Sequence, residues 1–269
     1  MAWVCQPSRS YDSCRNVALF KKIRNWRIRR VIARHPIAED LWRDALERCS
    51  PARRLSASDQ ATLRVLATLF LDRKSLEPVT GLRLDDADRV LLAAHACVPI
   101  LKLGFDWYDG WHSVIVYPEA FMPGRQEMDA AGVVHQTNRV LAGEAWGRGP
   151  VILSWADVLG IGQKPGHNVV IHEMAHKIDM QNGAANGFPP LHRRMDRRVW
   201  SEVFSSAWDH LHDEQRKGTA LPIDPYALES PAEFFAVTSE HFFEAPARLR
   251  QHLPDVYRQL EQFYRQHPL

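Results

Sequence analysis

Apolar side chains recur at helical spacing in the first and last parts of the chain. Between about residues 36 and 103 they return every three or four positions, for instance at Leu63, Leu66 and Phe70. Ser and Asp residues stand where such helices would begin, which is typical of N-caps. Helical spacing is found again in the second half, at 169–179, at 195–214, at 230–243 and from Pro246 onward. The pattern predicts a mainly helical protein.

The stretch between these helical parts follows a different pattern. After Gly104, short apolar runs are bounded by Gly and Pro, as expected for strands. The predicted strands span 111–117, 133–135, 139–146 and 151–155. We therefore expect an α+β fold in which a small mixed sheet precedes the helix at 169–179.

The last predicted strand carries Val151, Leu153 and Trp155 and is the candidate edge of this sheet. A peptide substrate can add to such an edge as a further strand. The alternative is a strand that is paired on both sides, and the sequence leaves the two open.

No repeat or long linker divides the chain of 269 residues. Residues 1–19 lack periodicity and are expected to form a loose tail. Residues 20–269 are expected to form one compact domain, with a helical N-terminal part at about 36–103 and a catalytic part at about 104–269.

Composition and charge exclude several classes of protein. The longest mainly apolar run, Val90 to Leu101, is too short to span a bilayer, and the first twenty residues contain no signal-like apolar core. The chain has four cysteines, Cys5, Cys14, Cys49 and Cys97. We expect them to be reduced thiols of a cytoplasmic protein. No membrane partner is expected.

A basic run lies between Lys21 and Arg34 and is interleaved with apolar residues such as Trp26. It could bind nucleic acid or an anionic membrane, but the net charge of the whole chain is only +2. A solvated basic helix is therefore the favoured interpretation, and nucleic acid is an unlikely partner.

The chemistry-bearing motif is His-Glu-x-x-His, formed by His172, Glu173 and His176. On a helix, residues four apart share a face, so the two imidazoles can bind one metal ion while Glu173 acts as general base on a water. Asn168 precedes the apolar run as a good N-cap, and Asp179 is placed to hydrogen-bond His176 or His172 from behind.

Catalytic zinc needs a third protein ligand, and the spacing leaves this ligand open. A third histidine six residues after His176 is excluded, because position 182 is Asn. The remaining candidates are carboxylates on a later helix, namely Glu229, Glu233 and Glu240. Glu233 also fits a capping box with Ser230, which offers a purely structural explanation, and spacing alone leaves it only slightly ahead of the others.

Four stretches resemble the Mlc titration factor family, bacterial cytoplasmic zinc metallopeptidases similar in their active site to the catalytic domain of anthrax lethal factor. They read LKLGFDWYDGWHSVIVYP, GPVILSW, VVIHEMAHKID and DPYALESPAEFFAVTSEHFF, within a match from about Ile37 to Leu269. The resemblance implies a zincin-like fold with one Zn²⁺ per chain. It places the glutamate ligand on Glu233 and a catalytic tyrosine on Tyr226.

The resemblance also implies what the chain acts on. It points to aminopeptidase-type hydrolysis of short peptides, in which Glu173 is the base and Tyr226 donates a hydrogen bond to the tetrahedral oxyanion. The alternative that it implies is a regulatory protein that sequesters a transcriptional repressor of sugar uptake, with or without proteolysis. No stretch of the sequence identifies such a partner.

Overall fold

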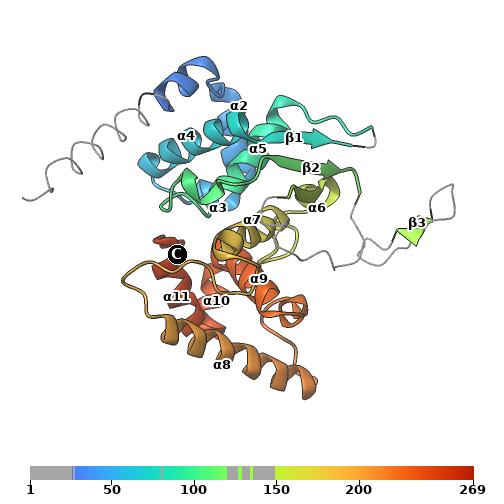
Figure 1. The fold of residues 1–269 in the computed structure, drawn as a ribbon, viewed down its shortest axis with the longest axis vertical. Coiled ribbons are helices and arrows are strands. Elements are labelled where there is room, and N and C mark those ends of the chain that lie inside the picture. The colour runs from blue at the N-terminus through green and yellow to red at the C-terminus, as the bar shows by residue number, and fades with distance from the viewer. Residues whose placement is uncertain (1–25, 27, 80, 120–126, 129–133, 136–148) are drawn as a thin grey trace, which may run out of the picture. The chain divides into compact units, whose positions relative to one another are not determined.

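Figure 1 shows the computed structural model, which describes Trp26 and residues 28–79, 81–119, 127–128, 134–135 and 149–269. The chain divides into two units, Met1–Pro36 and Ile37–Leu269. In the first unit, Trp26 and residues 28–34 are helical, and the guanidinium of Arg30 lies 5.3 Å from the centre of the Trp26 ring. The expected tail at residues 1–19 lies outside the described residues.

The second unit begins with helices, and side-chain caps mark the start of two of them. These helices are α2 (Glu39–Arg48), α3 (Ser50–Arg53), α4 (Ala57–Arg73) and α5 (Asp86–Cys97). The Ser56 hydroxyl accepts a hydrogen bond from the Asp59 N–H at the start of α4, and Asp85 forms a capping box with Asp88 at the start of α5. Helix α5 packs against both α2 and α4.

A strand interrupts this helical part, which the sequence analysis did not anticipate. Strand β1 (Ser75–Pro78) pairs with β2 (Ser113–Tyr117), and β2 pairs with β5 (Val151–Ser154). Both pairings are parallel, in the order β1-β2-β5. The expectation of a mixed sheet is therefore wrong for these three strands. Alternate residues of β2, Val114 and Val116, are fully buried.

The remaining strand predictions have different outcomes. The strand expected at 133–135 corresponds to β4 (Val134–His135), which forms a separate antiparallel pair with β3 (Glu127–Met128). The strand expected at 139–146 lies outside the described residues. Trp155 does not continue β5, because the Ser154 hydroxyl caps helix α6 (Trp155–Leu159), which begins there.

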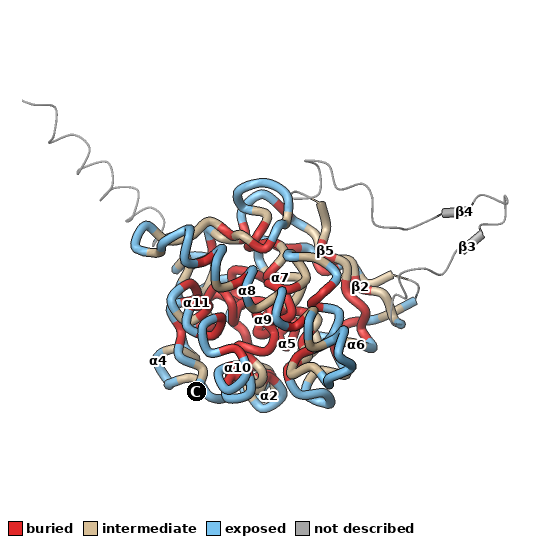
Figure 2. The backbone as a smooth tube through the Cα atoms, turned by 90° about the horizontal axis from the view of Figure 1, so that it is seen from below, coloured by how far each residue is buried: buried red, intermediate tan, exposed pale blue. Residues whose placement is uncertain are grey.

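The C-terminal part is helical, as predicted. It contains α7 (Val169–Asp179), the short 3₁₀ turn η4 (Pro225–Leu228) and the helices α8 (Arg197–Arg216), α9 (Pro231–Glu244), α10 (Pro246–His252) and α11 (Pro254–Tyr264). Aromatic rings from α8, α9 and α11 pack together: the ring centroid of Trp200 on α8 lies 6.0 Å from that of Phe235 on α9 and 5.7 Å from that of Phe263 on α11. In Figure 2 the buried residues gather around α7, α9 and α5.

Helix α7 lies between the two helical parts of this unit. It contacts β5, α5 and α6 on one side and packs against α9 on the other (Figure 1). Three of its residues, Ile171, Met174 and Ile178, are fully buried. This burial holds the helix rigidly in the core. In the described part of the chain, every helix is too short or too polar to cross a membrane.

Candidate metal centre

Helix α7 brings the two histidines of the motif together. Its N-cap is Asn168, whose side-chain oxygen accepts a hydrogen bond from the Ile171 N–H at 3.0 Å. One turn further on, the Nε2 atoms of His172 and His176 lie 3.2 Å apart. The rings are nearly perpendicular, at 82°. Both nitrogens can therefore point at one ion from the same helix face.

Helix α9 supplies the third group. Ser230 caps it by accepting the Glu233 N–H at 3.2 Å, and Pro231 occupies the first turn. The carboxylate oxygen Oε2 of Glu233 lies 3.0 Å from His172 Nε2 and 3.3 Å from His176 Nε2. The two other candidates lie elsewhere: Glu229 is exposed just after η4, and Glu240 faces the opposite nitrogen of His172.

The geometry of these three side chains fits a metal ion. Within the described residues, His172, His176 and Glu233 form a group whose ligand atoms all lie within 4.8 Å of one another. Three atoms bound at about 2.1 Å to one tetrahedral ion would stand about 3.4 Å apart, close to the separations of 3.0 to 3.3 Å seen here. Among the described residues, Glu233 Oε2 is also buried without a hydrogen-bond partner, which fits an oxygen that binds a cation.

The charges around the site favour a cation. Burial alone would raise the pKa of Glu233, but His172 and His176 hold it well below its usual value. Burial likewise would lower the pKa of His172, but Glu233 and Glu240 raise it well above its usual value. The carboxylates are thus held as anions around this histidine pair, and a metal ion can replace the proton that they attract.

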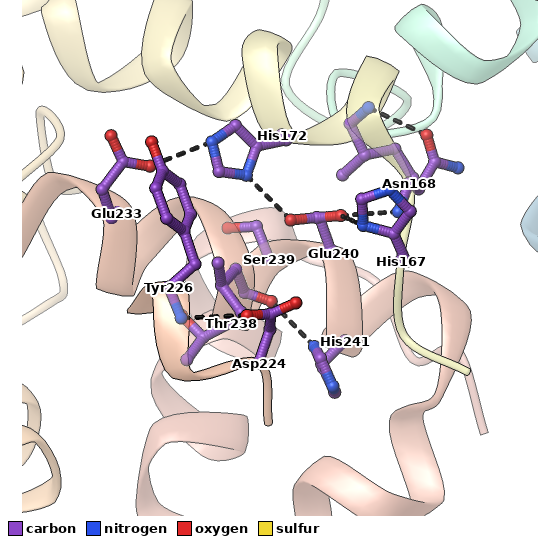
Figure 3. Close-up of polar contacts among 12 residues, drawn as sticks. His167, Asn168, His172, Asp224, Tyr226, Glu233, Thr238, Ser239, Glu240 and His241 are labelled. Atoms are coloured by element: carbon purple, nitrogen blue, oxygen red, sulfur yellow. Dashed lines mark hydrogen bonds and ion pairs between the residues drawn. The ribbon is translucent and has the colours of Figure 1, made fainter. Parts of the chain in front are cut away.

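Glu240 holds His172 from behind (Figure 3). Its Oε1 lies 2.8 Å from His172 Nδ1, and its Oε2 accepts the Asn168 N–H at 2.5 Å. His167 Nδ1 lies 3.4 Å from the same Oε2. Burial raises the pKa of Glu240, but these donors lower it below its usual value. A carboxylate behind a metal-binding histidine fixes the orientation and tautomer of its ring.

From the sequence, Glu240 was a candidate ligand, and its position behind His172 was not predicted. The signal that could have identified its role is its position seven residues after Glu233, on nearly the same face of α9. Both carboxylates therefore face α7, one toward each ring nitrogen of His172.

A buried amide ties α7 to its surroundings. The Asn168 Nδ2 lies 2.6 Å from Glu244 Oε1 on α9 and 2.9 Å from His95 Nδ1 on α5. Cys49 Sγ lies 3.5 Å from the same His95 nitrogen. Burial lowers the pKa of His95 to about 4, so this ring is neutral. His95 is a packed core residue, and it reaches the start of the motif helix through Asn168.

Glu173 and Tyr226 share a cavity with His172. Tyr226 lies on η4, whose N-cap is Asp224, and the carboxylate of Asp224 accepts the Tyr226 N–H at 2.9 Å. The Tyr226 ring centre is 6.0 Å from that of His172, and 41% of the residue is exposed. Figure 3 shows the phenol extending toward the gap between His172 and Glu233. These positions leave both groups accessible to a substrate.

Asp179 is fully buried and shapes the loop after α7. Its Oδ2 accepts the N–H groups of Asn186 and Gly187, each at 2.7 Å. Its Oδ1 and the Nδ1 of His176 are both buried without a hydrogen-bond partner among the described residues. The orienting role expected for Asp179 toward a histidine stays a prediction.

The candidate substrate edge also stays a prediction. Strand β5 lies at one end of the order β1-β2-β5. Val151 and Leu153 are buried, whereas Trp155 belongs to α6. The segments on either side of β4 lie outside the described residues.

Most of the chain is similar to known proteins. The family model described as glucose-regulated metallo-peptidase M90 matches residues 23–265. Mlc titration factor A of Salmonella agona is 41% identical over 217 residues, which cover 80% of this chain and 82% of the relative. The Salmonella arizonae protein of the same name is 40% identical over 234 residues, or 86% of this chain and 92% of the relative. The chain belongs to the glucose-regulated metallo-peptidase M90 family.

Proposed function

We propose that this chain is a zinc-dependent peptidase that hydrolyses short peptides, with an aminopeptidase-type preference for the end of the chain. The observation that carries the proposal is the convergence of His172, His176 and Glu233 on one point beside Glu173. Two imidazoles and one carboxylate, with a fourth position open to solvent, are the ligand set of catalytic zinc.

A bound zinc ion would supply an acidified water and polarise the carbonyl of the scissile bond. Glu173 lies next to His172 in the sequence and lines the same cavity, so its carboxylate is the base for that water. Glu173 would accept the proton that a water loses as the oxygen of that water attacks the carbonyl carbon. As the C–N bond breaks, Glu173 returns this proton to the leaving nitrogen.

Tyr226 is placed to stabilise the oxyanion that develops during this attack. We expect Tyr226→Phe to lower kcat for peptide hydrolysis by about 100-fold, because one hydrogen-bond donor to the oxyanion is lost. The zinc affinity should be unchanged, since Tyr226 is not in the metal-binding group. Steady-state kinetics together with zinc titration measure both. An unchanged kcat would show that Tyr226 only packs beside His172.

Glu240 should act on the metal through His172. We expect Glu240→Gln to weaken zinc binding by about 10-fold to 100-fold, because the His172 ring loses its charged partner. Competition with a chromophoric chelator measures this affinity. Glu244→Gln is the matched control, since it lies one turn further along α9 and contacts Asn168 instead of His172. Equal zinc affinity in wild type and Glu240→Gln would contradict the orienting role.

A second candidate function is regulatory binding, and the relatives' name favours it: they are Mlc titration factors. This chain would then bind a transcriptional repressor of the Mlc kind. A partner that wild type binds without cleaving it, and that Glu173→Gln binds with the same affinity, would indicate titration without cleavage. A pull-down with wild type and Glu173→Gln separates these outcomes, because only wild type would process a partner that is a substrate.

A further inference from the structure

A cavity of about 460 Å³ opens beside His172. His172, Glu173 and Tyr226 line it on the side of the metal centre, and Ile223 and Val237 form an apolar part of its wall. A volume of this size is enough for one large side chain of a peptide. A peptide whose carbonyl is held at the metal centre would thus place a neighbouring side chain in this cavity.

The inner wall of the cavity is closely packed. Gly166 has φ +82°, and a Cβ at this position would stand 2.4 Å from the Nε2 of His241. His241 is buried, and its Nδ1 lies 3.1 Å from the Val237 carbonyl, so the ring is held in place. The imidazole of His241 and Gly166 therefore pack tightly against each other in the cavity wall.

Two cations line the opening from different elements. Lys164 lies in the loop before α7, and Arg248 lies on α10. Both are exposed. Among the described residues, no ion pair of either is found. The side chains of the two residues therefore have no acidic partner of their own in this part of the chain.

Two carboxylates that line the same cavity already accept hydrogen bonds from other groups of the protein. Glu240 is bonded to His172 and Asn168 and lies beside His167. Asp224 uses one oxygen to cap η4. Apart from Glu173, which acts in the reaction itself, the described lining of the cavity thus presents Lys164 and Arg248 without an ion-pair partner and one partly used carboxylate, that of Asp224.

We propose that this cavity receives an acidic side chain, from a residue next to the scissile bond, with Lys164 and Arg248 as its counter-charges. The proposal rests on the peptidase function argued above. The methylene groups of a glutamate would contact Ile223 and Val237, and its carboxylate would reach the cationic opening. The substrate class is then short peptides that carry Glu or Asp beside the bond that is cut.

The test measures binding of labelled pentapeptides to zinc-loaded Glu173→Gln, which traps uncleaved peptides. Two matched series carry Glu, Gln or Lys on either side of the target bond. In the series whose varied side chain enters the cavity, we expect the Glu peptide to bind about fivefold more tightly than the Gln peptide. The Lys peptide should bind more weakly than both. The difference should shrink at high salt, because exposed charges are screened.

A charge reversal makes the test specific. In the same background, Arg248→Glu should reverse the order so that the Lys peptide binds more tightly than the Glu peptide. Arg250→Glu is the matched control, because Arg250 is an exposed residue of α10 that does not line the cavity. Both variants carry the same Glu173→Gln change, so its lost charge cancels in the comparison.

The outcomes separate the two proposals. Peptides that bind without any preference for charge, or a preference that Arg248→Glu leaves unchanged, would overturn the assignment of the cavity alone. If the zinc-loaded protein binds none of the peptides, the peptidase function itself fails, and the assignment of the cavity fails with it.

Discussion

Replacing Glu173 with Gln should abolish most of the peptide hydrolysis while the metal stays bound. The change keeps the shape of the side chain and removes its ability to accept a proton. General-base catalysis contributes about 100-fold to 10,000-fold, so we expect kcat to fall by about 1,000-fold. Zinc content should match wild type, because Glu173 is outside the group of converging ligand atoms. Hydrolysis of a panel of chromogenic aminoacyl substrates, with zinc analysis of the same samples, measures both.

Glu202→Gln is the control for this variant, since Glu202 is an exposed glutamate of α8 that lies outside the cavity. It should retain wild-type rates. Equal rates in wild type and Glu173→Gln would mean that a contaminating enzyme produces the activity, or that Glu173 is not the base.

Replacing Glu233 with Ala should remove the metal. Its carboxylate supplies one of three ligand atoms and also balances the charge of the site. Loss of a partner behind a ligand already costs about 10-fold to 100-fold in metal affinity, so loss of the ligand itself should cost more than about 100-fold. Competition with a chelator gives the affinity, and circular dichroism checks that the variant keeps the helical content of wild type.

Glu229→Ala tests the specificity of that result. Glu229 was an open candidate for the same role, but it is exposed on the far side of Ser230 from the helix. The Glu229→Ala variant should bind zinc with the affinity of wild type. Tight zinc binding by Glu233→Ala together with loss by Glu229→Ala or Glu240→Ala would move the third ligand to the other residue.

The part of the site that local sequence rules could predict is the part built by one helix. His172 and His176 are four residues apart in an apolar run that Asn168 caps, so their convergence follows from helix geometry alone. Glu233 is 57 residues beyond His176, and no local rule brings them together. The resemblance to a known family indicated Glu233, and the packing of α9 on α7 places it beside the histidines.

The elements that the sequence analysis missed depend on distant partners. Strand β1 has only four residues and ends in Pro78, and it is a strand because β2 pairs with it from 38 residues away. The parallel direction of the sheet likewise depends on how the chain returns between strands, which periodicity does not encode. The role of Glu240 was missed for the same reason, because it depends on contacts with His172 and Asn168, which are distant in the sequence.

The central claim is that one zinc ion binds between α7 and α9, and anomalous diffraction at the zinc edge tests it most directly. Crystals of the zinc-loaded wild type should show one peak at about 2.0–2.2 Å from His172 Nε2, His176 Nε2 and the Glu233 carboxylate. A peak bound by Glu240 instead of Glu233, or no peak near His172 and His176 in zinc-saturated protein, would contradict the account.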